Sequence, residues 1–359
     1  MPPRKDFPNP EQIKALTPKS EGMAEDVRSV MPFATTEVPS IPTPGHEKRE
    51  ANEEEIFLMG AVEHFMSAFF GHHGFRETPI INNRYVRITQ KIKNESLAAF
   101  EHPQSHLGST GLYSDIVLDA FHPDRPDGVR TFLHVAAHEF AHAKSKNQWT
   151  IGERTLRRIT GFNNIIAHIS TPEDPRLNRF PTKKFFNGLN EAMTEMIAIL
   201  VFQDIADSQW FRETQRENEE ATRELRTRAT ASGAIADAEI IGFSQNSNGE
   251  IQTIFAYQSE LIVLDLLVRN IEEVTQTPPQ EILHLFIADY AEGTMKRVTP
   301  LLRRTFGNNI LRVLSVWEPN EPNNAQDIQR YLLEKDSHRR DILARQYLES
   351  HGTVPQSSS

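Results

Sequence analysis

The stretch HVAAHEFAHAKSK, residues 134–146, places three histidines and a glutamate within nine consecutive positions. The chain has 359 residues and only 14 histidines, so this density is unusual. The residues 128–146 around it carry apolar side chains at helical spacing and lysines near the end, where positive charge suits a helix C-terminus. We therefore predict one helix over residues 128–146 that bears all three histidines.

Within this helix, the pattern HEFAH has the form H-E-x-x-H. His138 and His142 are four positions apart, which places them about 40° apart around a helix and one turn apart in height, so both imidazoles can face one ion. Glu139 lies about 60° from His142 on the same side. This arrangement favours a zinc ion held by two neutral imidazoles, with a carboxylate near enough to take a proton from a water molecule on the metal. His134 lies one turn earlier, but no glutamate follows it.

A catalytic zinc site needs a third protein ligand, and the chain contains no cysteine, so this ligand must be His, Asp or Glu. The stretch LNEAMTEM, residues 189–196, offers Glu191 and Glu195 four positions apart on one face of an apolar segment. Buried carboxylates need partners, and a metal with its histidines is such a partner. The spacing alone does not decide which of the two glutamates binds zinc.

Together, HEFAH and NEAMTE resemble the gluzincins, the thermolysin-like branch of the zinc metallopeptidases, in which H-E-x-x-H is followed by a helix with N-E-x-x-[ST]-[DE]. The resemblance covers about residues 110–200, and the spacing from His142 to Glu191 is longer than in the thermolysin group. It implies His138, His142 and Glu191 as zinc ligands and Glu139 as the general base. It also implies that Glu195 orients the first histidine through the free ring N–H.

The same resemblance implies a further donor that stabilises the tetrahedral intermediate, commonly a Tyr or His after the third ligand. Tyr257 is the first candidate because it opens an apolar helix, and His284 is a poorer alternative. The alternating stretch 111–121 is a candidate edge strand that would bind the substrate backbone by strand addition.

Composition limits the partners of this chain. There are 39 basic and 49 acidic side chains, and the net charge of -10 disfavours nucleic acid and anionic membrane surfaces. No signal peptide and no membrane-spanning run is visible in the sequence, so a cytoplasmic location is the default expectation. We expect a peptide or protein substrate, while the oligomeric state stays open.

The rest of the chain predicts an α+β fold. Alternation and β-branched residues predict strands over 78–92 and 111–121 and a hairpin-like region over 154–183, whereas helical periodicity predicts helices over 53–75 and 185–206. Three apolar stretches between residues 254 and 317 predict three or four helices. We expect a zincin-like catalytic core with a small twisted sheet, two ligand-bearing helices and a helical C-terminal subdomain. The predicted segments are a loosely packed or disordered lead-in (1–52), the core (53–204), a charged helix or mobile insert (205–248), the helical subdomain (249–348) and a frayed tail (349–359).

The sequence therefore predicts a zinc-dependent peptidase, and two alternatives compete with it. In one, a noncatalytic zincin-like protein keeps a structural or degenerate metal site and binds a partner through residues 212–240. In the other, HEFAH is a chance pattern and the chain holds no metal. The remaining histidines of interest are better explained as packed or exposed side chains than as ligands: His72, His73, His134 and His168.

Overall fold

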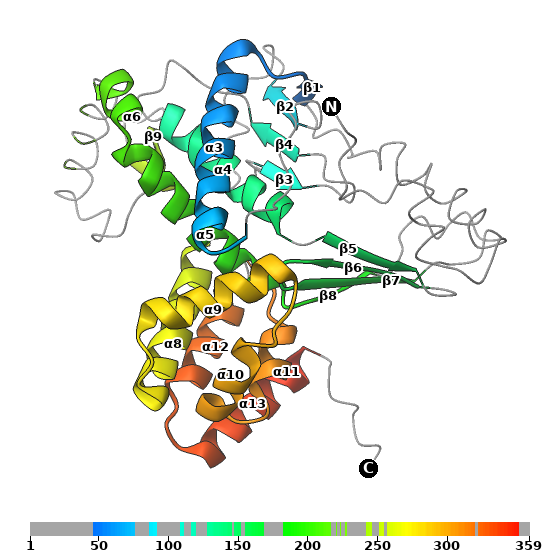
Figure 1. Ribbon diagram of the computed structural model, residues 1–359. Coiled ribbons are helices and arrows are strands. Elements are labelled where there is room, and N and C mark those ends of the chain that lie inside the picture. The colour runs from blue at the N-terminus through cyan, green and yellow to red at the C-terminus, as the bar shows by residue number, and fades with distance from the viewer. Residues whose placement is uncertain are drawn as a thin grey trace, which may run out of the picture. The chain divides into compact units, whose positions relative to one another are not determined.

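The computed structural model describes residues 46–75, 86–91, 108–110, 116–119, 128–145, 147–151, 155–168, 182–216, 242–245, 251–254, 257–319 and 322–351, with the single residues 220, 223 and 227. Over these residues the chain is mostly helical, with small sheets (Figure 1). The predicted combination of helices with small sheets is therefore confirmed for the described residues. Most of the predicted lead-in and tail lies outside the described residues.

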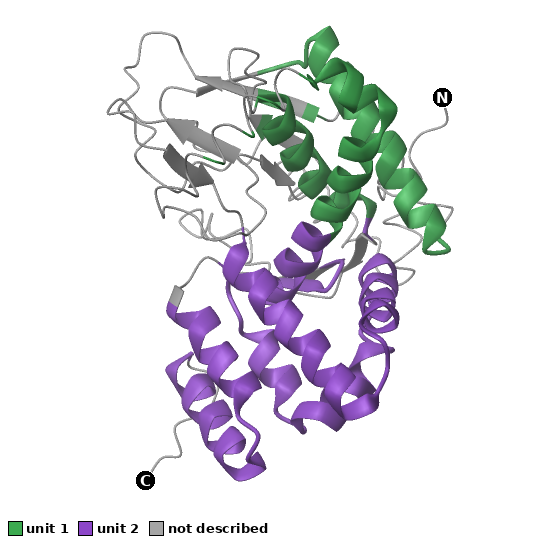
Figure 2. Ribbon diagram, turned by 90° about the vertical axis from the view of Figure 1, so that its left-hand side faces the viewer, with its two compact units in different colours: residues 1–10, 20–144, 197–256 green, residues 11–19, 145–196, 257–359 purple. Residues whose placement is uncertain are grey.

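The described residues belong to two compact units (Figure 2). Unit 1 contains the described residues of 46–144 and 197–254, and unit 2 contains those of 145–196 and 257–351. Helix α5 (Asn187–Asp207) begins in unit 2 and ends in unit 1. The five segments predicted from the sequence divide the chain in another way, and their limits stay a prediction.

Unit 1 combines a small sheet with two long helices. The sheet has the strand order β1-β2-β4-β3, and its members are β1 (His46–Arg49), β2 (Val86–Lys91), β3 (Gly108–Thr110) and β4 (Ile116–Asp119). Helix α3 (Glu53–His72) packs on α4 (Gly128–Lys144), which also packs on β3 and β4. The predicted helices over 53–75 and 128–146 are therefore confirmed, and a small sheet does pack against the helix that carries HEFAH.

Local hydrogen bonds fix the beginning of α3. The Asn52 side chain accepts a hydrogen bond from the Glu55 backbone N–H at 2.8 Å, and the Glu55 carboxylate accepts one from the Asn52 backbone N–H at 2.9 Å. This reciprocal capping satisfies backbone donors that the helix itself leaves unpaired. Arg49, in β1, donates from both terminal nitrogens to the buried Glu55, each at 2.7 Å, and these bonds raise the pKa of the guanidinium against the opposing effect of burial. The strand and the helix are thereby held together.

The predicted edge strand over residues 111–121 is wrong in its position within the sheet. Its described part, β4, forms a parallel pair with β2 and an antiparallel pair with β3, so it has a neighbouring strand on each side. The three-residue strand β3 takes the edge instead. A strand paired on both sides has its backbone hydrogen bonds satisfied, so β4 cannot bind a substrate by strand addition.

Unit 2 begins with an antiparallel meander. Its strands follow one another in chain order as β5 (Asn147–Ile151), β6 (Thr155–Thr160), β7 (Asn163–His168) and β8 (Thr182–Phe185). The predicted hairpin-like region over 154–183 is confirmed in its first part by β6 and β7, while residues 169–181 lie outside the described residues. Its turn contains Gly161 at φ +55°, a left-handed conformation that favours glycine.

Six helices make up the C-terminal part of unit 2 in the described residues: α8 (Gln258–Thr275), α9 (Pro279–Glu292), α10 (Val298–Phe306), α11 (Ile310–Ser315), α12 (Pro322–Leu333) and α13 (Ser337–Ser350). Four of them, α8 to α11, cover the stretches for which three or four helices are predicted. Helices α12 and α13 lie largely within the predicted helical subdomain (249–348), but no separate helix was predicted after residue 317 because their polar composition hides a buried stripe. That stripe includes Ala325, Ile328, Tyr331, Leu332, Ala344, Tyr347 and Leu348.

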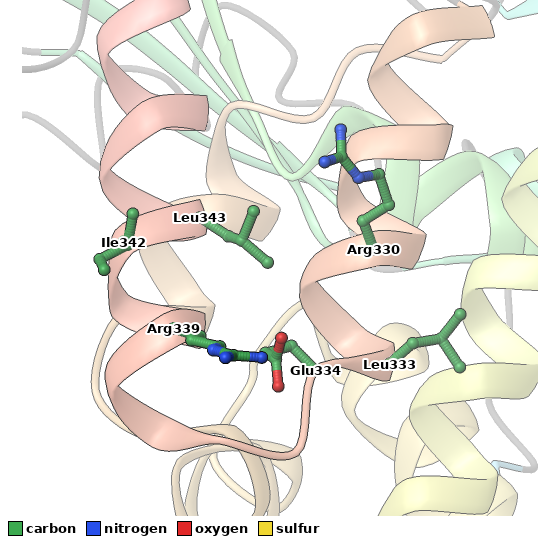
Figure 3. Close-up of a pocket in the computed structure, with 6 residues that line it drawn as sticks. All are labelled: Arg330, Leu333, Glu334, Arg339, Ile342 and Leu343. Carbon is green, nitrogen blue, oxygen red and sulfur yellow. The ribbon is translucent and has the colours of Figure 1, made fainter.

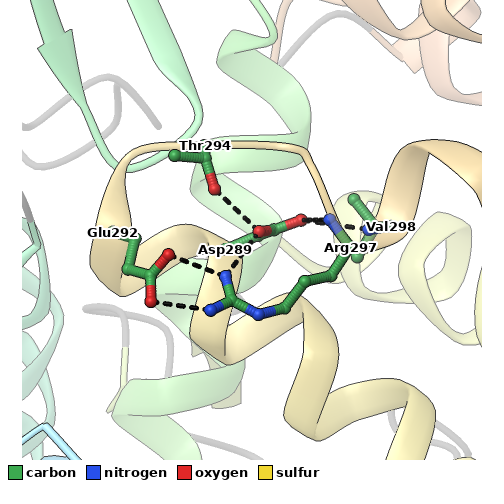
Figure 4. Close-up of polar contacts among 5 residues, drawn as sticks. All are labelled: Asp289, Glu292, Thr294, Arg297 and Val298. Atoms are coloured by element: carbon green, nitrogen blue, oxygen red, sulfur yellow. Dashed lines mark hydrogen bonds and ion pairs between the residues drawn. The ribbon is translucent and has the colours of Figure 1, made fainter.

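The turn between α9 and α10 is built around the fully buried Asp289 (Figure 4). Its carboxylate accepts hydrogen bonds from the Thr294 hydroxyl at 2.7 Å and from the backbone N–H groups of Arg297 and Val298 at 2.7 and 3.0 Å. The Arg297 guanidinium donates to Glu292 at 2.7 and 2.8 Å and to Asp289 at 3.0 Å, and these hydrogen bonds raise its pKa. The C-terminal end of α9 is therefore rigidly held.

The charged segment 205–248 is described only in part. It contains the short helix α6 (Gln209–Thr214) and the strand β9 (Gly242–Gln245), which pairs with β10 (Ile251–Ile254) in a two-stranded ladder that the sequence analysis did not predict. Among the described helices, none combines the length and the apolar character that crossing a bilayer requires.

Candidate metal centre

Helix α4 presents the H-E-x-x-H residues from a mostly buried position. His138 and Glu139 are 7% and 5% exposed, and His142 is half-buried. The ring centroids of the two histidines lie 4.9 Å apart. At the end of the helix, the buried Lys144 donates to Glu63 of α3 at 2.7 Å, which fixes the position of α4 along α3. The two imidazoles therefore lie side by side, as their spacing predicts.

Glu191 joins these histidines from α5. The ligand atoms of His138, His142 and Glu191 all lie within 4.8 Å of one another, and within the described part of the chain no other set of three or more His, Asp or Glu residues forms such a group. Two imidazoles and one carboxylate are a donor set typical of catalytic zinc. Donor atoms that share one zinc ion lie about 3.3 Å apart, since Zn–N and Zn–O distances are about 2.0–2.2 Å, so a pair of donors at the 4.8 Å limit would have to approach by about 1.5 Å to share the ion.

A second contact between the same two helices lies farther along them. The Arg130 guanidinium carbon is 4.7 Å from the centre of the Phe202 ring, and the His134 ring centroid is 6.1 Å from it. His134 therefore packs on an aromatic ring, one turn before His138 on α4.

The other histidines that the sequence analysis set aside are also outside this group. His73 packs against Phe69, with ring centroids 4.6 Å apart, and His72 is exposed at the end of α3. His168 is the last residue of β7. That none of these histidines binds a metal stays a prediction.

Glu195 lies one turn after Glu191 on α5 and is completely buried. It is not a member of the metal group, so the two glutamates that the spacing could not separate differ in the structure. A fully buried carboxylate is costly without polar partners, which is consistent with a role beside the site. The orienting role of Glu195 and the proton-transfer role of Glu139 stay predictions.

Asn190 and Thr194, the other polar residues of NEAMTE, have contacts that the sequence analysis did not foresee. The Asn190 side-chain oxygen accepts hydrogen bonds from the backbone N–H groups of Phe162 and Asn163 at 3.0 and 3.3 Å. The Thr194 hydroxyl donates to the Asn190 carbonyl at 2.8 Å and lies 2.8 Å from the Tyr290 hydroxyl. The signal in the sequence was an amide and a hydroxyl beside the two glutamates in a mostly apolar helix, since buried polar groups need hydrogen-bond partners.

Tyr257 precedes α8 as its N-cap residue, in a left-handed conformation with φ 56° and ψ 27°, and is partly exposed. A tyrosine at positive φ is uncommon and indicates a constrained position. The alternative residue, His284, is exposed on α9. Neither belongs to the metal group, and the assignment of Tyr257 as a catalytic donor stays a prediction.

A surface groove lies between α12 and α13, with no residue of the metal group in its lining (Figure 3). It has a volume of about 500 Å³ and is lined by Arg330, Leu333, Glu334, Arg339, Ile342 and Leu343. Its one carboxylate, that of Glu334, accepts a hydrogen bond from the Asp336 backbone N–H at 2.9 Å. The groove therefore offers neither a metal-ligand set nor a pair of groups for acid–base chemistry.

Comparison with known proteins adds no assignment, because no family model, no curated protein and no solved structure matches this chain.

Proposed function

We propose that this protein is a zinc-dependent peptidase whose metal ligands are His138, His142 and Glu191. The observation that carries the proposal is the convergence of these three side chains from two helices, with their ligand atoms within 4.8 Å of one another. The resemblance of HEFAH and NEAMTE to the gluzincins supports the same ligand set. A zincin-like core and membership of that group of enzymes are part of the proposal.

Zinc, when bound, polarises a carbonyl oxygen and lowers the pKa of a water molecule. Glu139 follows His138 on α4 and is the proposed general base, which accepts the proton of the attacking water and returns it to the leaving amine. Its burial excludes bulk water from the carboxylate and strengthens its electrostatic interactions with neighbouring groups. Glu195 is proposed to orient His138, and Tyr257 to donate a hydrogen bond to the developing oxyanion.

A noncatalytic protein with a structural metal site is the second candidate, and the burial of the site favours it. A catalytic zinc keeps one position open for water and substrate, whereas structural sites are closed. His138 and Glu139 are less than a tenth exposed, as expected for a closed site.

The substitution Glu139→Gln tests the proposed reaction. The amide is nearly isosteric and still hydrogen-bonds to water, but it cannot accept a proton. We expect the variant to keep its zinc, while hydrolysis of an unbiased peptide mixture falls by about 10² to 10⁴, the usual contribution of general acid–base catalysis.

Zinc content and peptide cleavage are measured side by side for the wild type and the variant. Equal cleavage by both would remove Glu139 from the mechanism. A wild type that holds about one zinc per chain and cleaves no peptide would favour the structural site, and a wild type without zinc would exclude both candidates.

A further inference from the structure

Helix α5 carries two parallel stripes of polar side chains. Asn190 and Thr194 lie about 40° apart around the helix, and Glu191 and Glu195 form a second stripe about 100° away from them. The glutamate stripe contains the proposed metal ligand, and the other stripe carries the buried hydrogen bonds described above. The two stripes rotate together because they belong to one rigid helix.

Asn190 fixes one point of α5 against the β6–β7 turn. Its side-chain oxygen accepts hydrogen bonds from two consecutive backbone N–H groups, those of Phe162 and Asn163. The approach is close, since a Cβ added to Gly161 would lie 2.5 Å from this oxygen and 2.6 Å from the Tyr290 ring. A glycine in the turn is therefore required for Asn190 and Tyr290 to pack against it.

Tyr290 fixes a second point, one turn farther along α5. The Tyr290 hydroxyl lies 2.8 Å from the Thr194 hydroxyl, which also donates to the Asn190 carbonyl. Both side chains are completely buried. The Tyr290 ring packs edge-to-face on Phe162 with centroids 5.8 Å apart, so it holds the turn and the helix at once.

The support behind Tyr290 is rigid. The preceding residue, Asp289, accepts four hydrogen bonds in the α9–α10 turn, and Figure 4 shows them converging on its carboxylate. Gly293 ends α9 at φ 64°. A side chain on such a fixed helix end can hold another helix in one rotation about its axis.

We propose that Tyr290 is a positioning residue for the metal centre, acting through Thr194 to fix the rotation of α5 and thereby the place of Glu191. This inference rests on the proposed metal centre. Side chains reach about 5–6 Å from a helix axis, so a rotation of about 10° moves a carboxylate by about 1 Å. Metal–ligand distances tolerate only about 0.2 Å, so an unconstrained α5 would hold the third ligand poorly.

Tyr290→Phe removes the hydroxyl and keeps the ring against Phe162. We expect zinc to bind about tenfold more weakly, in the range typical of residues that orient a ligand without binding the metal. The absorption spectrum of the cobalt-substituted protein should change, because the geometry of the third ligand changes. Thr194→Val removes the same contact from its other side together with the hydrogen bond to the Asn190 carbonyl, so it should weaken zinc at least as much as Tyr290→Phe does, and the two effects should not add.

Two comparisons separate positioning from a general loss of stability. Tyr331→Phe is the matched control, since Tyr331 is also buried in unit 2 and donates its hydroxyl proton to the Phe306 carbonyl at 3.2 Å, with no part in the α5 contacts described above. It should leave zinc affinity and the cobalt spectrum unchanged. In a Glu191→Ala background, where only the two histidines are left to bind zinc weakly, Tyr290→Phe should weaken this residual binding no further.

Unchanged zinc affinity of Tyr290→Phe in a zinc-binding wild type would overturn the positioning role and leave the metal centre intact. An equal loss of zinc affinity in the Glu191→Ala background would also overturn it, since Tyr290 would then act by another route. A wild type that binds no zinc removes the metal centre and, with it, this inference.

Discussion

Each ligand of the proposed metal centre supplies one donor atom, so a single substitution removes a third of the coordination that the protein provides. His138→Ala, His142→Ala and Glu191→Ala should therefore abolish stoichiometric zinc, whereas Glu195→Ala should weaken binding by only about 10- to 100-fold. Metal analysis of the purified variants checks this order.

The control is His72→Ala, which changes an exposed histidine on α3 outside the metal group and should retain full zinc. Full zinc in both His138→Ala and His142→Ala would contradict the site. If Glu195→Ala lost more zinc than Glu191→Ala, Glu195 would be the metal ligand and Glu191 the residue that orients the histidine.

Gly60 in α3 and Gly188 in α5 differ in the space that a side chain would find. A Cβ added to Gly60 in α3 would meet no atom within 4 Å, whereas one added to Gly188 in α5 would lie 2.3 Å from the Trp317 ring. Gly60→Ala should raise the free energy of unfolding by about 0.5–1 kcal/mol, because alanine is the better helix former. Gly188→Ala should lower it by about 1–3 kcal/mol, because the buried Trp317 must move.

Denaturant unfolding of the two variants and the wild type measures both values. The identical chemical change makes each variant the control for the other. Stabilisation by Gly188→Ala would show that the first turn of α5 is not packed on Trp317 as the structure has it.

Stability of the molecule at high pH should depend on Tyr331. Burial raises the pKa of this phenol above its usual value of 10.0, with Arg340 opposing the shift and Asp341 adding to it. The unfolded chain therefore loses the proton at a lower pH than the folded protein does. The stability that Tyr331 contributes is complete below about pH 10 and falls as the pH rises beyond it, by at most about 1.4 kcal/mol per pH unit.

In Tyr331→Phe this contribution is absent, so its free energy of unfolding should fall less steeply above pH 10 than that of the wild type. Urea unfolding of both proteins between pH 8 and about pH 11 compares the slopes. Other groups titrate in both proteins, and the difference between the slopes isolates Tyr331. Equal slopes would contradict the raised pKa.

The helices and the hairpin that the sequence predicts are those whose signals are local. Apolar periodicity indicated α3, α4 and α5, because the geometry of a helix relates residues three and four positions apart. For the same reason, HEFAH by itself places His138 and His142 on one face of α4. The polar helices α12 and α13 were not delimited within the predicted helical subdomain because their buried residues are sparse. The strand β4 was misplaced because its pairing with the short β3 leaves no pattern within β4 itself.

Contacts between residues far apart in the sequence determine which glutamate joins the metal group and which partners the buried polar residues of α5 have. Glu191 and Glu195 occupy equivalent positions one turn apart, and only the packing of α5 brings Glu191 into the group with His138 and His142. Asn190 meets a turn 28 residues earlier, and Thr194 meets Tyr290 96 residues later. Periodicity along a chain says which face of a helix is buried, but the neighbours on that face depend on how separate elements pack, which no local spacing encodes.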